Sequence, residues 1–151
     1  MTDYRYLGRS ALKVSPLSLG TMMFGGPTPD DVAFRIIDKA REQGINFIDT
    51  ADVYHNGKSE EVVGRGIKAT RDHWVLATKF VNSHVKGPNL GGHSRKWVIE
   101  TVDNSLRRLG TDYIDILYFH RAVFDAPLEE PVRAIADLIR AGKLRYFCVS
   151  N

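Results

Sequence analysis

The chain has 151 residues, of which 43% are hydrophobic and 26% charged, and it carries a formal net charge of +3. This composition is typical of a folded domain and excludes an intrinsically disordered chain. Lys and Arg are spread along the sequence and no apolar run approaches the length of a membrane span, so we expect neither nucleic acid nor a membrane as a partner.

The two ends of the sequence bear on location and redox chemistry. Residues 1–5 contain no apolar stretch of the kind that directs secretion, which predicts a cytoplasmic protein. Cys148 is the only cysteine, so no disulfide can form within the chain. It lies in the apolar run 146–149, and we expect a buried, inert thiol.

In chain order, the first predicted elements are a hairpin and a strand. Residues 4–7 and 12–15 are short extended segments joined by a turn at 8–11. Residues 16–22 are predicted to form the first buried strand, which ends at the Gly-rich loop 24–27.

A helix follows with recognisable start signals. We expect Thr28 to cap it and Pro29 to occupy its first position, with Gly44 just past its end. Its apolar face is predicted to comprise Ala33, Ile36, Ile37 and Ala40.

The rest of the chain alternates strands with helices. Further strands are predicted from residue 46 and at 75–79, 114–120 and 145–150, and helices from Ser59, Ser94 and Glu129. In the last helix, Pro131 fits only the first turn, and the apolar face is Val132, Ile135 and Leu138 or Ile139. The long loop 81–93 is typical of a binding loop.

This order predicts the N-terminal portion of a (β/α)8 TIM barrel: a β-hairpin followed by five parallel strands and four helices. A complete barrel usually needs about 250 residues. An open doubly wound sheet is the alternative, although no strand is followed by the Gly-rich turn of its nucleotide-binding versions.

Two sequence patterns fail their structural context. Residues 64–69 match the dinucleotide pattern GxGxxA, but they lie inside a predicted helix rather than between a strand and a helix. His84 and His93 share one loop without a cysteine or third histidine nearby, so we predict no metal site.

Polar side chains end three successive predicted strands. Asp49, Lys79 and His120 stand at these ends, and Tyr54 follows just beyond Asp49. Each alone is more often structural than functional. Together they occupy the same edge of a parallel sheet, which is where barrel enzymes place their active sites.

These four residue types suit carbonyl chemistry. A phenol is a poor acid at neutral pH, but a neighbouring ammonium group favours its ionised form. Asp49 can hold Lys79 in place, His120 can orient a carbonyl oxygen, and Tyr54 can then donate a proton. No side chain supplies a hydride, so a nicotinamide cofactor is the natural partner.

Residues 47–54, 77–79 and 116–120 resemble the signatures of the aldo-keto reductase family, and residues 7–10, 19–22 and 142–151 resemble its hairpin, first strand and fifth strand. The resemblance implies reduction of aldehydes or ketones with NADPH. It also implies that Asp49, Tyr54, Lys79 and His120 form the family's catalytic tetrad.

The same resemblance assigns cofactor contacts to six positions. Gly20, Thr21 and Met22 match residues that line the nicotinamide, Asp49 lies beside them, and Ser150 and Asn151 match the pair that binds its carboxamide. The loop at 21–26 resembles the bacterial and potassium-channel β-subunit branch.

The family has eight strands, whereas only five are predicted here. We therefore expect residues 1–151 to be a single partial barrel domain without its C-terminal half, which would supply the main phosphate and adenine contacts. Such a domain is expected to self-associate or to bind the missing half.

Two other functions stay open at this point. A Schiff-base aldolase also uses a lysine at a barrel strand end, here Lys79. A truncated, noncatalytic module that senses a cofactor or binds a partner is the second alternative. For the reductase, the expected partner is a small carbonyl substrate.

Overall fold

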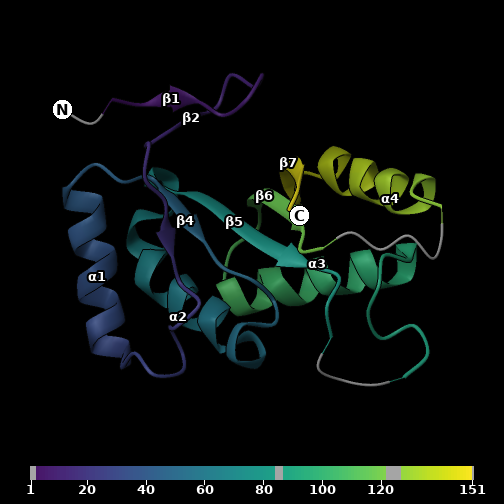
Figure 1. The fold of residues 1–151 in the computed structure, drawn as a ribbon, viewed down its shortest axis with the longest axis horizontal. Coiled ribbons are helices and arrows are strands. Elements are labelled where there is room, and N and C mark those ends of the chain that lie inside the picture. Colours follow the sequence, from purple (N-terminus) through teal and green to yellow (C-terminus); the bar gives the residue numbers. More distant parts are fainter. Residues whose placement is uncertain (1–2, 84–86, 122–126, 151) are drawn as a thin grey trace.

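The computed structural model describes residues 3–83, 87–121 and 127–150 (Figure 1). His84 and Asn151, named above, lie outside these ranges. The strands are β1 Arg5–Tyr6, β2 Lys13–Val14, β3 Leu19–Gly20, β4 Phe47–Asp49, β5 Val75–Phe80, β6 Ile114–Phe119 and β7 Leu144–Val149. The α-helices are α1 Asp30–Glu42, α2 Lys58–Ile67, α3 Arg95–Leu109 and α4 Glu129–Arg140, with short 3-10 helices η1 Tyr54–Gly57 and η2 Lys68–His73.

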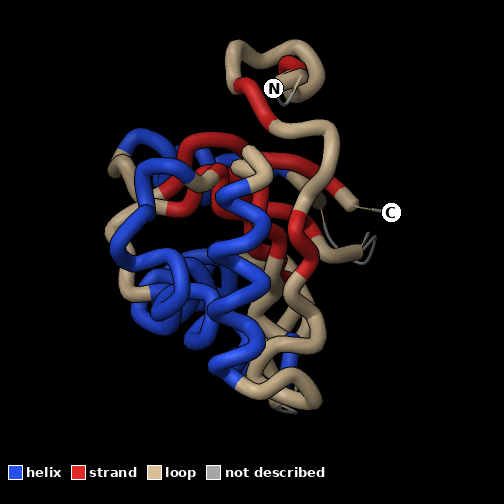
Figure 2. The backbone as a smooth tube through the Cα atoms, turned by 90° about the vertical axis from the view of Figure 1, so that its left-hand side faces the viewer, coloured by secondary structure: helices blue, strands red, loops and turns tan. Residues whose placement is uncertain are grey.

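The five strands β3 to β7 form one parallel sheet in sequence order, which confirms the predicted topology. Each α-helix contacts the next one along the chain, and Figure 2 shows the helices gathered on one side of the strands. A doubly wound sheet would carry helices on both faces, so this arrangement excludes it and fits part of a barrel wall.

The sheet has a different core on each face. The helix-covered face holds the larger cluster, which includes Ile37, Ile48 and Leu117. On the other face, Val75, Ala77 and Ile116 pack with Val14 of the hairpin and with half-buried Tyr146 and Cys148. The prediction of a buried Cys148 is therefore wrong in degree, because its strand β7 has no neighbour on one side among the described residues.

The β1–β2 hairpin lies beyond the start of β4 and is held there by Asn46 (Figure 1). The side-chain amide of Asn46 accepts a hydrogen bond from Ser15 N at 2.8 Å and donates one to Lys13 O at 3.1 Å. This leaves the opposite ends of the strands, where the polar residues lie, uncovered by the hairpin.

The first helix starts differently from the prediction. Pro29 is the N-cap residue and no side chain caps the helix, so Thr28 is one position too early to do so. Its buried face comprises Ala33, Ile37 and Ala40, whereas Ile36 is exposed. Gly44 has a φ of 77°, as expected for the residue just past a helix end.

Other predicted boundaries hold or shift by a few residues. Ser94 caps α3 by accepting a hydrogen bond from Trp97 N at 3.2 Å, as predicted. In α4, Pro131 lies in the first turn, Leu138 rather than Ile139 is buried, and Val132 is 48% exposed. The first strand of the sheet is only Leu19–Gly20, shorter than the predicted 16–22, and it pairs with β4 alone among the described residues.

Candidate active site

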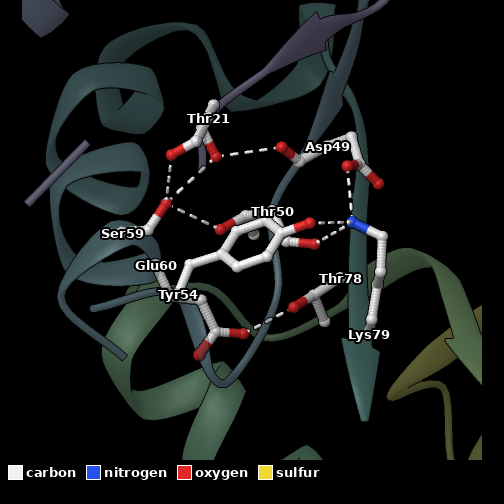
Figure 3. Close-up of polar contacts among 8 residues, drawn as sticks. All are labelled: Thr21, Asp49, Thr50, Tyr54, Ser59, Glu60, Thr78 and Lys79. Carbon is white, nitrogen blue, oxygen red and sulfur yellow. Dashed lines mark hydrogen bonds and ion pairs between the residues drawn. The ribbon is translucent and has the colours of Figure 1, made fainter. Parts of the chain in front are cut away.

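The ammonium group of Lys79 is the centre of the strand-end cluster. Its Nζ lies 2.5 Å from Asp49 Oδ2, 2.8 Å from the carbonyl oxygen of Thr50 and 3.1 Å from Tyr54 Oη (Figure 3). The side chain is almost completely buried, and β4 and β5 are paired in register directly beside it. The three contacts account for the three hydrogens of an ammonium group.

Tyr54 reaches this centre because the chain turns sharply after β4. His55 and Asn56 both have left-handed backbone angles, with φ of 48° and 58°. Asp52 N donates a hydrogen bond to Lys79 O at 3.2 Å, which fixes the loop on β5. The ring of Tyr54 is thereby held with its centroid 4.9 Å from Lys79 Nζ.

The direction of the Lys79–Tyr54 hydrogen bond has a chemical consequence. An ammonium group can only donate, so Tyr54 Oη is the acceptor. The hydroxyl hydrogen of Tyr54 is then available to a third group, such as the oxygen of a bound carbonyl compound.

His120 completes the group predicted from the sequence. It follows β6, its backbone N–H donates to Phe80 O at 3.0 Å, and its ring centroid is 5.9 Å from that of Tyr54 in an edge-on arrangement. Burial lowers the pKa of His120, the charges of Lys79 and Arg121 lower it further, and Asp49 opposes them. The imidazole is therefore neutral at pH 7.

A second set of contacts, missed by the sequence analysis, holds the strand ends together. Ser59 Oγ lies 3.1 Å from Thr21 Oγ1 and 3.0 Å from Thr50 Oγ1, and it donates to Thr21 O at 2.8 Å (Figure 3). Thr21 Oγ1 also donates to Asp49 O at 2.9 Å. The first turn of α2 thus ties the ends of β3 and β4 to each other.

The next residue of α2, Glu60, ties this helix to β5. Glu60 is fully buried, accepts a hydrogen bond from Thr78 Oγ1 at 2.6 Å and forms an ion pair with Arg108 Nε at 2.6 Å. The sequence analysis placed Glu60 only at a helix start. A threonine directly before Lys79 was the one available signal, and the arginine lies 48 residues away in the sequence.

Residues predicted to bind a cofactor border the same strand ends. A Cβ built at Gly20 would meet no other described atom within 4 Å, and Met22 is 56% exposed. Asp49 and Ser150 are half-buried. Open space beside a glycine, an exposed thioether and polar groups at the ends of β4 and β7 fit a flat nicotinamide ring. Thr21 is completely buried, and its hydroxyl is engaged by Asp49 and Ser59.

The described residues contain neither a metal-binding cluster nor a membrane-spanning helix. No group of three or more His, Cys, Asp or Glu side chains within residues 3–83, 87–121 and 127–150 could hold a metal ion. Over the same ranges, every helix is too short or too polar to span a bilayer.

The chain is similar to a known protein family and to a solved structure. The model of the Aldo/keto reductase family matches residues 16–151. A solved structure, the holo form of aldo-keto reductase AKR11C1 from Bacillus halodurans, is 39% identical with a TM-score of 0.90, covering 99% of this chain and 50% of that one.

Two curated relatives have different names. A Schizosaccharomyces pombe protein named "Putative voltage-gated potassium channel subunit beta" is 43% identical over 98% of this chain and 45% of its own length. The Uncharacterized oxidoreductase YqkF of Bacillus subtilis is 38% identical over 97% of this chain and 48% of its own. The chain therefore spans about half the length of the relatives it matches.

The fold agrees with these matches, since five parallel strands with helices on one side are the N-terminal part of a (β/α)8 barrel. The family match covers all of the sheet as well as the strand ends where Asp49, Lys79 and His120 lie. The chain belongs to the aldo/keto reductase family.

Proposed function

We propose that this chain carries the catalytic half of an NADPH-dependent reductase that converts small aldehydes or ketones to alcohols. The observation that supports this most directly is the contact of Lys79 Nζ with both Asp49 and Tyr54. An oxidoreductase function also agrees with the family and with the two relatives whose names contain oxidoreductase or reductase.

In this proposal, each side chain has one task. Tyr54 donates its hydroxyl hydrogen to the carbonyl oxygen, while Lys79 stabilises the phenolate that remains. Asp49 holds Lys79, and the neutral imidazole of His120 orients the carbonyl oxygen toward Tyr54. Gly20, Met22, Asp49 and Ser150 would border the nicotinamide ring, which supplies the hydride when bound. Asn151 remains a sequence-based assignment to the same ring.

The aldolase alternative is less consistent with the geometry. A Schiff base requires the neutral amine of a lysine as the nucleophile. Lys79 Nζ instead donates to three oxygen atoms, one of them a carboxylate 2.5 Å away, which stabilises the charged form. We therefore prefer the role of Lys79 as a partner of Tyr54.

A noncatalytic role in an assembly is the second candidate. One observation favours it: relatives at 43% and 41% identity are named as voltage-gated potassium channel β-subunits. The two functions make different predictions for the tetrad, because assembly does not require the hydroxyl of Tyr54.

The test follows absorbance at 340 nm during oxidation of NADPH with a panel of small aldehydes. It uses residues 1–151 alone and residues 1–151 fused to the remainder of the Bacillus halodurans reductase chain, which this chain matches with a TM-score of 0.90. We expect turnover by the fusion, and loss of at least about a hundredfold in turnover when Lys79 is changed to Met.

A matched control is Lys58→Met, because Lys58 is an exposed lysine at the start of α2. NADPH binding without reduction of any carbonyl compound by a folded fusion would favour the noncatalytic candidate. Failure of a folded fusion to bind NADPH would contradict the reductase proposal.

A further inference from the structure

A cavity of about 420 Å³ lies beside the tetrad, on the helix side of the sheet. One wall is the loop that follows β4, with Asp52 and Asn56, and the opposite wall is α3, with Trp97, Thr101 and Arg108. Its volume falls within the range of about 300–1,000 Å³ that small-molecule sites occupy. None of the four tetrad residues lines this cavity.

Three buried polar atoms of this cavity lack a partner. Asp52 Oδ1, Trp97 Nε1 and Thr101 Oγ1 make no hydrogen bond to any residue that the structure describes. Thr101 is only 3% exposed. Buried polar groups in folded proteins are almost always hydrogen-bonded, and an unpaired one costs about 1–3 kcal/mol. Three on the wall of one cavity indicate a partner within it.

The charges of the lining argue for an uncharged partner. Arg108 is neutralised by its ion pair with the buried Glu60. Burial, and after it the charge of Glu60, raises the pKa of Asp52 to about 8, although Arg108, a backbone hydrogen bond from Val53 and Lys79 act in the opposite direction. At neutral pH the lining therefore has no unpaired charge, and a buried ionic ligand would lack a counter-charge.

The unpaired atoms also define the hydrogen-bonding pattern of the partner. The indole of Trp97 only donates, Thr101 can donate and accept, and the protonated carboxyl of Asp52 can do both. The side-chain amides of Asn56, Asn82 and Asn104 border the same cavity and add donors and acceptors. A matching ligand needs neighbouring groups that each donate and accept hydrogen bonds. The hydroxyls of a polyhydroxy compound have this property.

We propose that this cavity is a binding site for a small, uncharged polyhydroxy compound such as a polyol or monosaccharide. All nine residues that line the cavity lie in the described part of the chain. The proposed site does not depend on the proposed reductase activity.

The two tryptophans allow a direct test by nuclear magnetic resonance, with D-glucose and glycerol as probes. The chain has two indole N–H groups: that of Trp97 borders the cavity, and that of Trp74 donates to Thr70 Oγ1 at 3.3 Å elsewhere. We expect a saturable shift of the Trp97 resonance with one of the probes and none of Trp74, with Trp74→Phe providing the assignment.

Two variants locate the site. Thr101→Val removes an unpaired hydroxyl without changing the shape of the side chain, so it should fold and weaken binding at least about fivefold, the equivalent of one neutral hydrogen bond. Asn104→Ala, which removes a side-chain amide from the same wall, should also weaken binding. Glu100→Gln, at an exposed position of α3 outside the cavity, should bind like the parent.

Several outcomes would overturn the proposal. A Trp97 resonance unmoved by both probes would mean that the cavity holds only water. A saturable shift with phosphate or methylammonium but with neither probe would show an ionic ligand. Unchanged affinity in folded Thr101→Val and Asn104→Ala would place the binding elsewhere.

Discussion

Thr78 and Lys79 are neighbours in β5, yet their side chains join two different charged clusters on opposite faces of the sheet. Lys79 contacts Asp49 on the open face, at 2.5 Å, and Thr78 contacts Glu60 on the helix-covered face, at 2.6 Å. This alternation follows from the geometry of a strand, in which successive side chains point to opposite faces. One short segment therefore supports two ion pairs with different surroundings.

The pairs differ in what they leave available. Glu60 is fully buried, and both of its oxygen atoms are engaged, one by Thr78 and the other by Arg108. The pair of Lys79 and Asp49 includes a third group, Tyr54, whose hydroxyl hydrogen can still be donated. A closed pair stabilises structure, whereas an open one can do chemistry. Four substitutions, from the largest expected effect to the smallest, test this distinction.

Tyr54→Phe should lower turnover of an active form about 10²–10⁴-fold, the usual contribution of a general acid, with cofactor affinity nearly unchanged. The ring and its packing are kept and only the hydroxyl is lost. Steady-state kinetics with NADPH and an aldehyde measure the effect. Tyr6→Phe, in the hairpin strand β1 and 62% exposed, is the matched control and should retain the parent rate. A Tyr54→Phe variant with more than about a tenth of that rate would assign the acid to another group.

Arg108→Met should lower the free energy of unfolding by about 3–5 kcal/mol, because it leaves the carboxylate of Glu60 buried without its counter-charge. Urea denaturation measures the change. Arg107→Met is the control: this neighbouring arginine is exposed, and its loss should cost less than about 0.5 kcal/mol. If both variants unfold at the same urea concentration as the parent, the ion pair of Glu60 and Arg108 does not stabilise the fold.

The open pair was predictable from the sequence and the closed one was not. Asp49, Lys79 and His120 lie at the ends of apolar runs, and parallel strands bring such ends to one edge of a sheet. Glu60 and Arg108 lie in two helices, where charged residues usually face solvent. Only the packing of α2 on α3 shows that they meet.

Helix faces were predicted less well for a related reason. Ile36 and Val132 fall at helical spacing, but each is exposed. A helix on the outside of a barrel wall touches the sheet and its neighbouring helices along a limited stripe, so apolar residues at its margin can stay in solvent. Periodicity gives the direction of a buried face but not its width.

Ser59→Ala should lower the free energy of unfolding by about 1–3 kcal/mol, since it removes a buried hydroxyl that contacts Thr21 and Thr50. It also loosens the strand ends that carry Asp49, so turnover should fall as well. Thermal unfolding and kinetics of the same variant separate the two effects. Ser10→Ala in the hairpin turn is the control, and its turnover should match the parent. Equal turnover in Ser59→Ala would show that the strand ends keep their positions without this residue.

Asp52→Asn should have the smallest effect at acidic pH, and an effect on stability that grows as the pH rises. The pKa of Asp52 rises from 3.8 to about 8 on folding, so between these values the folded chain holds a proton that the unfolded chain releases. The stability of the parent therefore falls as the pH rises from about 4 to about 8, and the asparagine variant lacks this loss. Thermal melts at pH 5 and pH 9 measure the effect. At pH 5 the parent and the Asp52→Asn variant should have similar stability. At pH 9 the variant should be clearly the more stable of the two, because the shift of about four pKa units, at about 1.4 kcal/mol per unit, destabilises the parent alone. Asp72→Asn, in η2 outside the cavity, should show no such difference. A gain for Asp52→Asn that is equal at both pH values would mean that Asp52 stays ionised in the folded chain, and the cavity beside it would then carry a negative charge.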